Sequence, residues 1–134
     1  MRIASALALI ATVTFVAACP DSAPGFCERS INCDPDTDDG SDEAAAAIDS
    51  CVEVQRDFFA DLRAAGDADC TALADAFEAQ SRCFAALDDC NEFNEPNNGT
   101  CVDEGEAVAA ACDAVVDASC ADTAAPSCGI GDGA

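Results

Sequence analysis

The chain has 134 residues, with 27 acidic residues against five basic ones, which gives a formal net charge of −22 at pH 7. This length suits one domain, and this charge repels nucleic-acid phosphates and anionic lipid headgroups, so it argues against nucleic-acid partners and electrostatic membrane binding. The chain contains no histidine, tryptophan, tyrosine or lysine. Alanine dominates its apolar fraction, so the core is thin for the length and gains from covalent cross-links.

An uncharged N-terminal segment precedes the first cysteine. Met1 and Arg2 give a short positive start, and residues 3–18 then carry no charge. That run is short for a membrane-spanning helix and is typical of a secretory signal peptide. The sequence therefore predicts export, with residues 1–18 as the leader.

The end of this run, Val16-Ala17-Ala18-Cys19, resembles the lipobox of bacterial lipoproteins. In that class the cysteine sulfur receives diacylglycerol, the chain is cut before the cysteine, and the new amino group is acylated. The resemblance covers only the N-terminal signal. It implies a lipid on Cys19, an anchor in a bacterial membrane, and a location on its periplasmic or cell-surface side. Ordinary cleavage at the same bond is the alternative and would leave Cys19 either as a free thiol or in a disulfide bridge.

The cysteine count supports the lipid. Of the 11 cysteines, a lipidated Cys19 leaves an even number that can pair completely, whereas an unmodified Cys19 leaves one thiol over. No two cysteines have the C-x-x-C spacing typical of redox and metal sites. Structural disulfides, each worth about 2–4 kcal/mol, are predicted instead. Their candidates are Cys27, Cys33, Cys51, Cys70, Cys83, Cys90, Cys101, Cys112, Cys120 and Cys128.

Residues 19–41 are expected to form an acidic tether, because prolines, glycines, Asp and Ser are frequent there and no helical or strand periodicity is visible. Within the acidic run 34–43, Asp34, Asp36 and Asp38 match the first acidic positions of an EF-hand calcium loop. The glycine then arrives one residue late, and alanine stands where the loop needs its last glutamate. A solvated tether is favoured, with calcium binding by these three carboxylates as the alternative.

Residues 42–134 are expected to form a cysteine-rich helical domain. Ser41 is a good N-cap for a first helix with one apolar face, and Gly66 is placed to end that helix. Asp69 is expected to cap a second helix, whose apolar stripe continues to Cys90.

A loop is predicted at residues 91–100, and Thr100 with Asp103 resembles a capping box for a third helix that continues to about Ser119. A short tail held by Cys128 follows. No segment alternates with period two. The predicted fold class is therefore all-α: a small disulfide-stapled three-helix up-down-up bundle with an acidic N-terminal tether.

Cysteine positions on these helices predict pairings. Two cysteines seven residues apart on one helix, such as Cys83 and Cys90, are about 10 Å apart and cannot bridge each other. If the predicted helices fold back on each other at their two turns, cysteines on different helices come opposite one another and can pair. This arrangement leaves Cys27 and Cys33 unassigned. The expected bridges are Cys70–Cys120, Cys90–Cys101, and either Cys51–Cys83, which is favoured, or Cys83–Cys112.

Five phenylalanines are expected in the core: Phe58, Phe59, Phe77, Phe84 and Phe93. Phe58 and Phe59 are adjacent, so both cannot face inward fully. One of them is expected to be partly exposed, which points to a contact surface.

The residues behind common catalytic mechanisms are missing. Without histidine there is no Ser-His or Cys-His activation, and without lysine there is no Schiff base. Carboxylate pairs such as Asp88/Asp89 and Asp113/Asp117 could act as acid and base, which makes a hydrolase a further hypothesis; two buried carboxylates in a concave site would support it.

The sequence favours a non-enzymatic lipoprotein of the bacterial cell envelope, without a cofactor, that has a structural or partner-binding role. Its partners would be the membrane, through the N-terminal lipid, and a protein of the envelope. A calcium-responsive binding module that uses residues 34–43 is the alternative.

Overall fold

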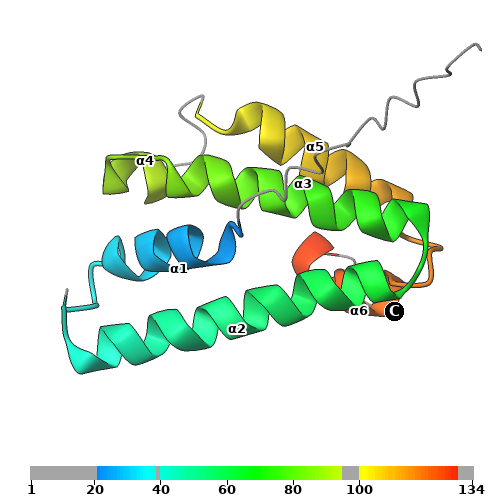
Figure 1. Cartoon of the computed structure of the whole chain (residues 1–134). Helices are drawn as coiled ribbons and strands as arrows, with labels where there is room; N and C mark the ends of the chain where they lie inside the picture. Colours follow the sequence, from blue (N-terminus) through cyan, green and yellow to red (C-terminus); the bar gives the residue numbers. More distant parts are fainter. Residues whose placement is uncertain (1–20, 39, 95–99, 130–134) are drawn as a thin grey trace, which may run out of the picture.

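The computed structural model describes residues 21–38, 40–94 and 100–129, and these ranges contain six helices and no strand (Figure 1). The helices are α1 (Ala23–Asn32), α2 (Asp42–Ala64), α3 (Ala68–Ala85), α4 (Cys90–Asn94), α5 (Val102–Ala114) and α6 (Ala121–Cys128). The all-α prediction is confirmed for these residues. The three-helix up-down-up bundle is not confirmed, because α1, α4 and α6 are further helices beside the three long ones.

Helix α2 begins and ends where the sequence predicts. The Ser41 hydroxyl accepts a hydrogen bond from the backbone N–H of Ala44 at 3.0 Å. Asp42 and Glu43 occupy the first turn, where the positive end of the helix dipole favours acidic side chains. Gly66 follows the last turn with φ +74°, a left-handed conformation that stops a helix and favours glycine.

Helix α3 differs from the prediction at both ends. Its N-cap is Asp67 and not Asp69, since the Asp67 carboxylate accepts a hydrogen bond from the Asp69 N–H at 3.0 Å. It ends at Ala85, before the expected Cys90, because a tight turn there directs Leu87 inward. The chain then starts α4 at Cys90, and this helix continues into the loop that was predicted at residues 91–100.

The expected capping box of α5 does not form. The residue before α5 is Cys101, which has φ +61° and makes no side-chain cap hydrogen bond. A disulfide ties Cys101 to Cys83 on α3. The start of α5 is therefore set by a tertiary cross-link, where the sequence suggested the local pair Thr100 and Asp103.

The C-terminal region also departs from the prediction of one long helix and a tail. Helix α5 ends at Ala114, and backbone turns through the buried Val115 lead into α6. Helix α6 occupies residues 121–128, where the tail was expected. Its last residue, Cys128, is bonded to Cys112 on α5, so the tail is folded back as a helix.

The prediction of an irregular tether is wrong for residues 23–32, which form α1. Pro24 lies in the first turn, where its missing N–H costs no helical hydrogen bond. Ala23 is fully buried, and a Cβ on Gly25 would lie 3.1 Å from the Cβ of Ala85 on α3. The small residues that suggested a tether therefore allow α1 and α3 to pack closely.

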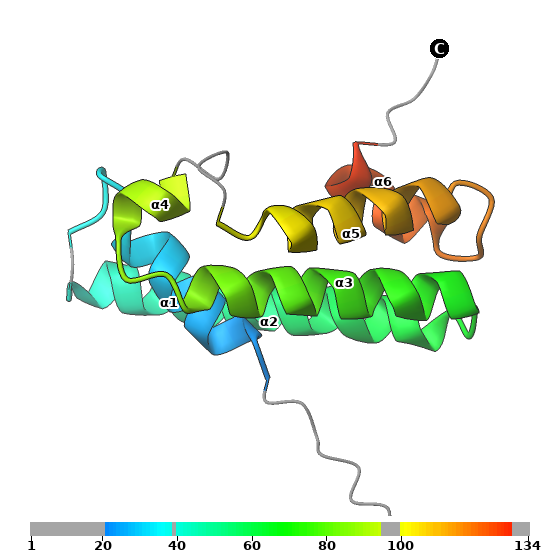
Figure 2. The same cartoon turned by 90° about the horizontal axis from the view of Figure 1, so that it is seen from above.

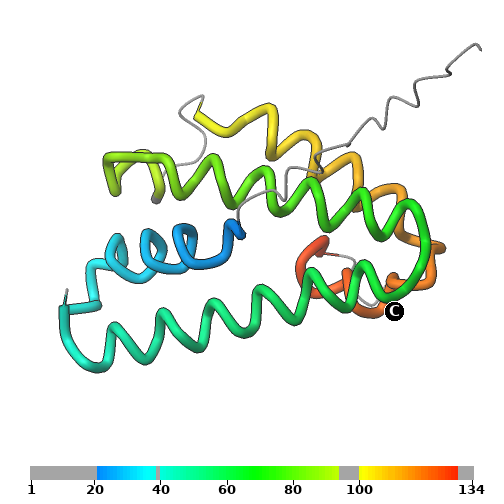
Figure 3. Tube along the Cα trace, viewed as in Figure 1, coloured from blue at the N-terminus to red at the C-terminus, as the bar shows by residue number. Residues whose placement is uncertain are grey.

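The short helices occupy the two ends of the α2–α3 pair. Helix α1 lies along the first half of α2 and packs against α2 and α3, while α6 lies near the other end of α2 (Figure 3). Seen from above, α5 and α6 lie together at one side of that pair (Figure 2). The core contains Leu62, Leu73 and Val115, all 0% exposed.

Five disulfides pair all ten cysteines of the described residues, so the prediction of disulfide bonding is confirmed. The bridges are Cys27–Cys51, Cys33–Cys90, Cys70–Cys120, Cys83–Cys101 and Cys112–Cys128.

Only one of the predicted pairings, Cys70–Cys120, is confirmed. The other expected pairs are wrong: Cys90–Cys101, Cys51–Cys83 and Cys83–Cys112. The physical reason is α1, because Cys27 on this helix bonds Cys51 on α2, and Cys33, the residue directly after it, bonds Cys90 on α4. Cys83 is then left for Cys101, and Cys112 for Cys128.

Candidate functional site

An apolar pocket of about 340 Å³ opens between α1, α2, α3 and α6. Phenylalanine rings form half of its lining residues, and the other side chains are a valine, two glutamines and two serines, all uncharged. A cavity of this kind, apolar with a few polar groups, is typical of a small-molecule site. Its lining residues are Phe26, Val54, Gln55, Phe58, Phe59, Phe77, Gln80, Ser81, Phe84 and Ser127.

One group of rings joins α2 to α3. The ring of Phe58 lies 5.8 Å from that of Phe59 and 5.5 Å from that of Phe77, measured between centroids. Phe59 is 5% exposed, while Phe58 is half-buried. Consecutive helix residues point in directions about 100° apart, so the Phe59 ring is buried and the Phe58 ring is partly exposed, although both line the pocket. The prediction that one of these two rings stays partly exposed is confirmed.

A second group of rings joins α1, α3 and α4. Phe26 lies 6.3 Å from Phe84 and 6.0 Å from Phe93 between ring centroids, and Phe84 lies 5.5 Å from Phe93. All three rings are half-buried. Of the five phenylalanines expected in the core, Phe59 is buried and the other four are half-buried; Phe58 and Phe77 pack against the core cluster, and all except Phe93 line the pocket.

Phe26 is the pocket phenylalanine that the sequence interpretation missed, because its segment was taken for a tether. A signal was present: Ala23, Cys27 and Ile31 recur every four residues, as on one face of a helix. Frequent prolines and acidic residues nearby masked this periodicity.

Gln55 contributes an unsatisfied polar atom to the pocket wall. Its side-chain oxygen is buried and has no hydrogen-bond partner among the described residues. Leaving such an acceptor unpaired costs about 1–3 kcal/mol. The remaining polar groups of the pocket come from Gln80, Ser81 and Ser127.

An ion pair fastens the start of α1 to α2. The Arg56 guanidinium donates a hydrogen bond to the Asp21 carboxylate at 2.7 Å, and the same carboxylate accepts one from the Ala23 N–H at 3.1 Å. Burial acts to raise the pKa of Asp21, but these two donors outweigh it and hold that pKa below its ordinary value.

A second cluster of charges crosses from α2 to α3. Arg63 donates to Asp75 and to Glu78, each at 2.9 Å, and Arg82 lies 3.7 Å from Glu78. Hydrogen bonds to Glu78 and Asp75 raise the pKa of Arg63 above its ordinary value. The cluster is partly exposed and none of its residues lines the pocket, so its role is to join the two helices.

The candidate calcium ligands lie in the exposed turn between α1 and α2. The Asp34 carboxylate accepts a hydrogen bond from the Asp36 N–H at 2.9 Å, so it is used within the turn. Asp36 and Asp38 line a polar hollow together with Glu43. Among the described residues, these carboxylates are not gathered as a set of three within ligand distance of one another.

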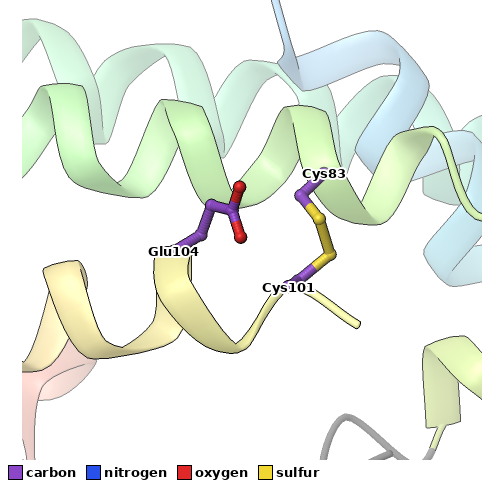
Figure 4. A group of neighbouring side chains, drawn as sticks. All are labelled: Cys83, Cys101 and Glu104. Atoms are coloured by element: carbon purple, nitrogen blue, oxygen red, sulfur yellow. A yellow bond between two sulfur atoms is a disulfide. The ribbon is translucent and has the colours of Figure 1, made fainter. Parts of the chain in front are cut away.

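A different trio does come that close within the described ranges. The Sγ atoms of Cys83 and Cys101 and a carboxylate oxygen of Glu104 all lie within 4.8 Å of one another (Figure 4). The two sulfurs are bonded to each other, so they offer no thiolate. Because metals bind cysteine as the thiolate, this trio is a disulfide with an acidic neighbour.

None of the carboxylates that could act in hydrolysis lines the pocket. Asp88, Asp89, Asp113 and Asp117 are all exposed. No Asp or Glu of the described residues is buried. The concave site with two buried carboxylates that would support a hydrolase is thus not found in these parts of the chain.

The predicted lipid attachment at Cys19 lies outside the described residues, as does the leader before it. Both stay predictions. Within the residues that the structure describes, no helix combines the length and the apolar composition needed to cross a membrane.

Comparison with other proteins adds no assignment. The chain matches no profile of a known protein family, no curated protein and no solved structure. The phenylalanine-lined pocket is therefore interpreted from its own geometry.

Proposed function

We propose that the protein is an exported lipoprotein of the bacterial cell envelope that acts as a non-enzymatic binding module. The observation that carries this proposal is the complete pairing of ten cysteines in five disulfides. Since the chain has 11 cysteines, Cys19 is the one left over. An extra cysteine at the end of an uncharged N-terminal run fits lipid attachment and not cross-linking.

The density of cross-links supports export. Disulfides form and persist in oxidising compartments and are rare in the cytoplasm. Five of them connect helices over residues 27–128, and each of the six helices takes part in at least one bridge, either directly or through the residue at its end. A chain whose folded state depends on so many bridges is suited to the periplasm or the cell surface.

The beginning of α1 brings the anchor close to the domain. Helix α1 starts at Ala23, four residues after Cys19. Four extended residues span at most about 14 Å. A lipid on Cys19 would therefore hold the folded domain near the membrane surface, whereas the sequence alone suggested a long tether.

The pocket supports a binding role over a catalytic one. Its lining contains no ionisable side chain, so it offers no general acid, general base or activated nucleophile. What it offers is apolar surface from several helices and a few hydrogen-bonding groups, which suits recognition.

Mass spectrometry of the N-terminal peptide tests the anchor. We expect cleavage before Cys19, with diacylglycerol on its sulfur and an acyl group on its amine. Cys19→Ser should move the protein from the membrane to the soluble fraction. The matched control, Cys112→Ser with Cys128→Ser, also replaces cysteines, in this case a disulfide pair, and should stay in the membrane fraction.

Two outcomes would disprove the proposal. One is an unacylated Cys19 on an intact leader. The other is a set of free sulfhydryls at the ten other cysteines in protein taken directly from cells.

A further inference from the structure

We propose that the phenylalanine-lined pocket binds an uncharged, apolar small molecule that carries a hydrogen-bond donor. This inference deepens the binding role proposed above. It does not depend on the lipid anchor, because the pocket is formed by α1, α2, α3 and α6 alone.

The walls of the pocket select an apolar ligand. Five phenylalanines face or border the cavity, and four of them are half-buried. Their exposed ring surface would be removed from water by an apolar occupant, which is the main driving force for such binding. A volume of about 340 Å³ lies at the small end of known ligand sites, so the ligand is small.

The charge distribution selects an uncharged ligand. None of the lining side chains is ionisable, so a charged group would lose hydration without gaining an ionic partner. An anion is further disfavoured by the net charge of −22. Fatty acids and other carboxylates are therefore poor candidates, although their chains are apolar.

The Gln55 amide selects a donor. Its oxygen is buried at the pocket wall without a partner among the described residues. The terminal torsion of a glutamine is broad and readily changes, so the amide can turn this oxygen toward a donor in the cavity. A hydroxyl or secondary amine on the ligand would then satisfy an acceptor that the protein leaves unpaired.

The surroundings of the pocket favour a small molecule over a protein segment. Stable protein interfaces bury roughly 1,200–2,000 Å² in total and need a broad apolar centre. Of the large apolar side chains that are exposed in the described residues, only Val54, at 66% exposure, lines the pocket. The apolar surface is thus confined to the cavity and its edge.

Three fluorescent probes that share the same ring system test the expected preference for an apolar, uncharged ligand with a hydrogen-bond donor. They are N-phenyl-1-naphthylamine, which is uncharged and has an N–H donor, its N-methyl derivative, which lacks the donor, and 8-anilino-1-naphthalenesulfonate, which carries a negative charge. Each is titrated into the full chain with Cys19→Ser, which lacks a lipid that would itself take up the probes. We expect saturable one-to-one binding of the first, about fivefold weaker binding of the second, and at least tenfold weaker binding of the third.

Matched variants assign the binding to the pocket. Ser127→Trp places a large ring at an exposed lining position and should abolish binding, whereas Ser50→Trp, exposed on α2 outside the lining, should leave it unchanged. Gln55→Leu should remove the preference for the N–H probe over its N-methyl derivative. Circular dichroism of each variant checks that the helices are intact.

Several results would overturn the inference. Absence of saturable binding by the uncharged probes, equal affinity for the sulfonate, or unchanged binding in Ser127→Trp would each refute the ligand class or the site. Equal affinity for the N–H and N-methyl probes would refute the role of the donor. Failure of binding together with a lipidated Cys19 would reject this inference and leave the lipoprotein proposal standing.

Discussion

The two disulfides that close the longest and the shortest loops should differ measurably in what they contribute to stability. The sequence separation is 57 residues for Cys33–Cys90 and 16 residues for Cys112–Cys128. Each bridge joins one buried cysteine to one half-buried cysteine, so removing either pair leaves similar local environments. The difference in unfolding free energy between the two double Cys→Ala variants therefore reports mainly the entropy of loop closure and only to a small extent side-chain packing.

The expected magnitude follows from the entropy of the unfolded chain. The Cys27–Cys51 bridge provides a shorter covalent path between Cys33 and Cys90 than the chain itself. The loop that Cys33–Cys90 closes therefore has an effective length of about 46 residues. The chain-entropy relation then gives about 4 kcal/mol for Cys33–Cys90 and about 3 kcal/mol for Cys112–Cys128. We expect the first variant to be less stable than the second by about 1 kcal/mol.

Urea unfolding followed by far-ultraviolet circular dichroism measures this difference. Both variants are made with Cys19→Ser, so that no odd thiol can exchange with the remaining bridges. Mass spectrometry of unreduced peptides verifies the other four bridges in each variant. A Cys112–Cys128 variant as unstable as the Cys33–Cys90 variant, or more so, would refute the loop-length argument and indicate that docking of α6 stabilises the fold directly.

Three further predictions test the core, an ion pair and the acidic turn. Leu73→Ala should lower the free energy of unfolding by about 2–5 kcal/mol, because Leu73 is 0% exposed; Val116→Ala, at an exposed position, is the control, and equal losses would contradict the described core. Asp21 has a lowered pKa, so its stabilisation is present above the unfolded value of about 3.8 and is lost as the pH falls through the folded value. Asp21→Asn should therefore lower the urea midpoint more at pH 6 than at pH 2.5, whereas Asp49→Asn, exposed on α2, should not, and a midpoint loss independent of pH would argue against the ion pair. Calorimetric titration should show no tight calcium binding, and a micromolar isotherm that Asp36→Asn abolishes would restore the calcium module.

The local features of this protein were predictable from its sequence. Ser41 and Gly66 mark the two ends of α2 because an N-cap hydroxyl and a left-handed glycine act within one helical turn. The apolar spacing along residues 44–62 likewise predicts the helix between them. The participation of ten cysteines in disulfides also follows from composition, since an oxidised chain without C-x-x-C spacing or histidine leaves them few other roles.

The partner of each cysteine was not predictable, and neither was α1. Residues 23–32 resemble a tether in composition, and their helix is stabilised by burial of Ala23 and Cys27 against α2 and α3. Missing this helix led to the wrong pairings Cys51–Cys83 and Cys90–Cys101, because Cys51 and Cys90 are bonded to Cys27 on α1 and to Cys33 directly after it.

The pocket was determined by tertiary structure alone. The sequence shows phenylalanines at helical spacing, which predicts burial but not whether a ring fills the core or borders a cavity. That outcome depends on how α1 and α6 pack on α2 and α3. This packing is set by contacts between residues that are distant in the chain. Helix ends and periodicity depend on neighbours within about four residues, whereas cross-links and cavities depend on how the helices pack.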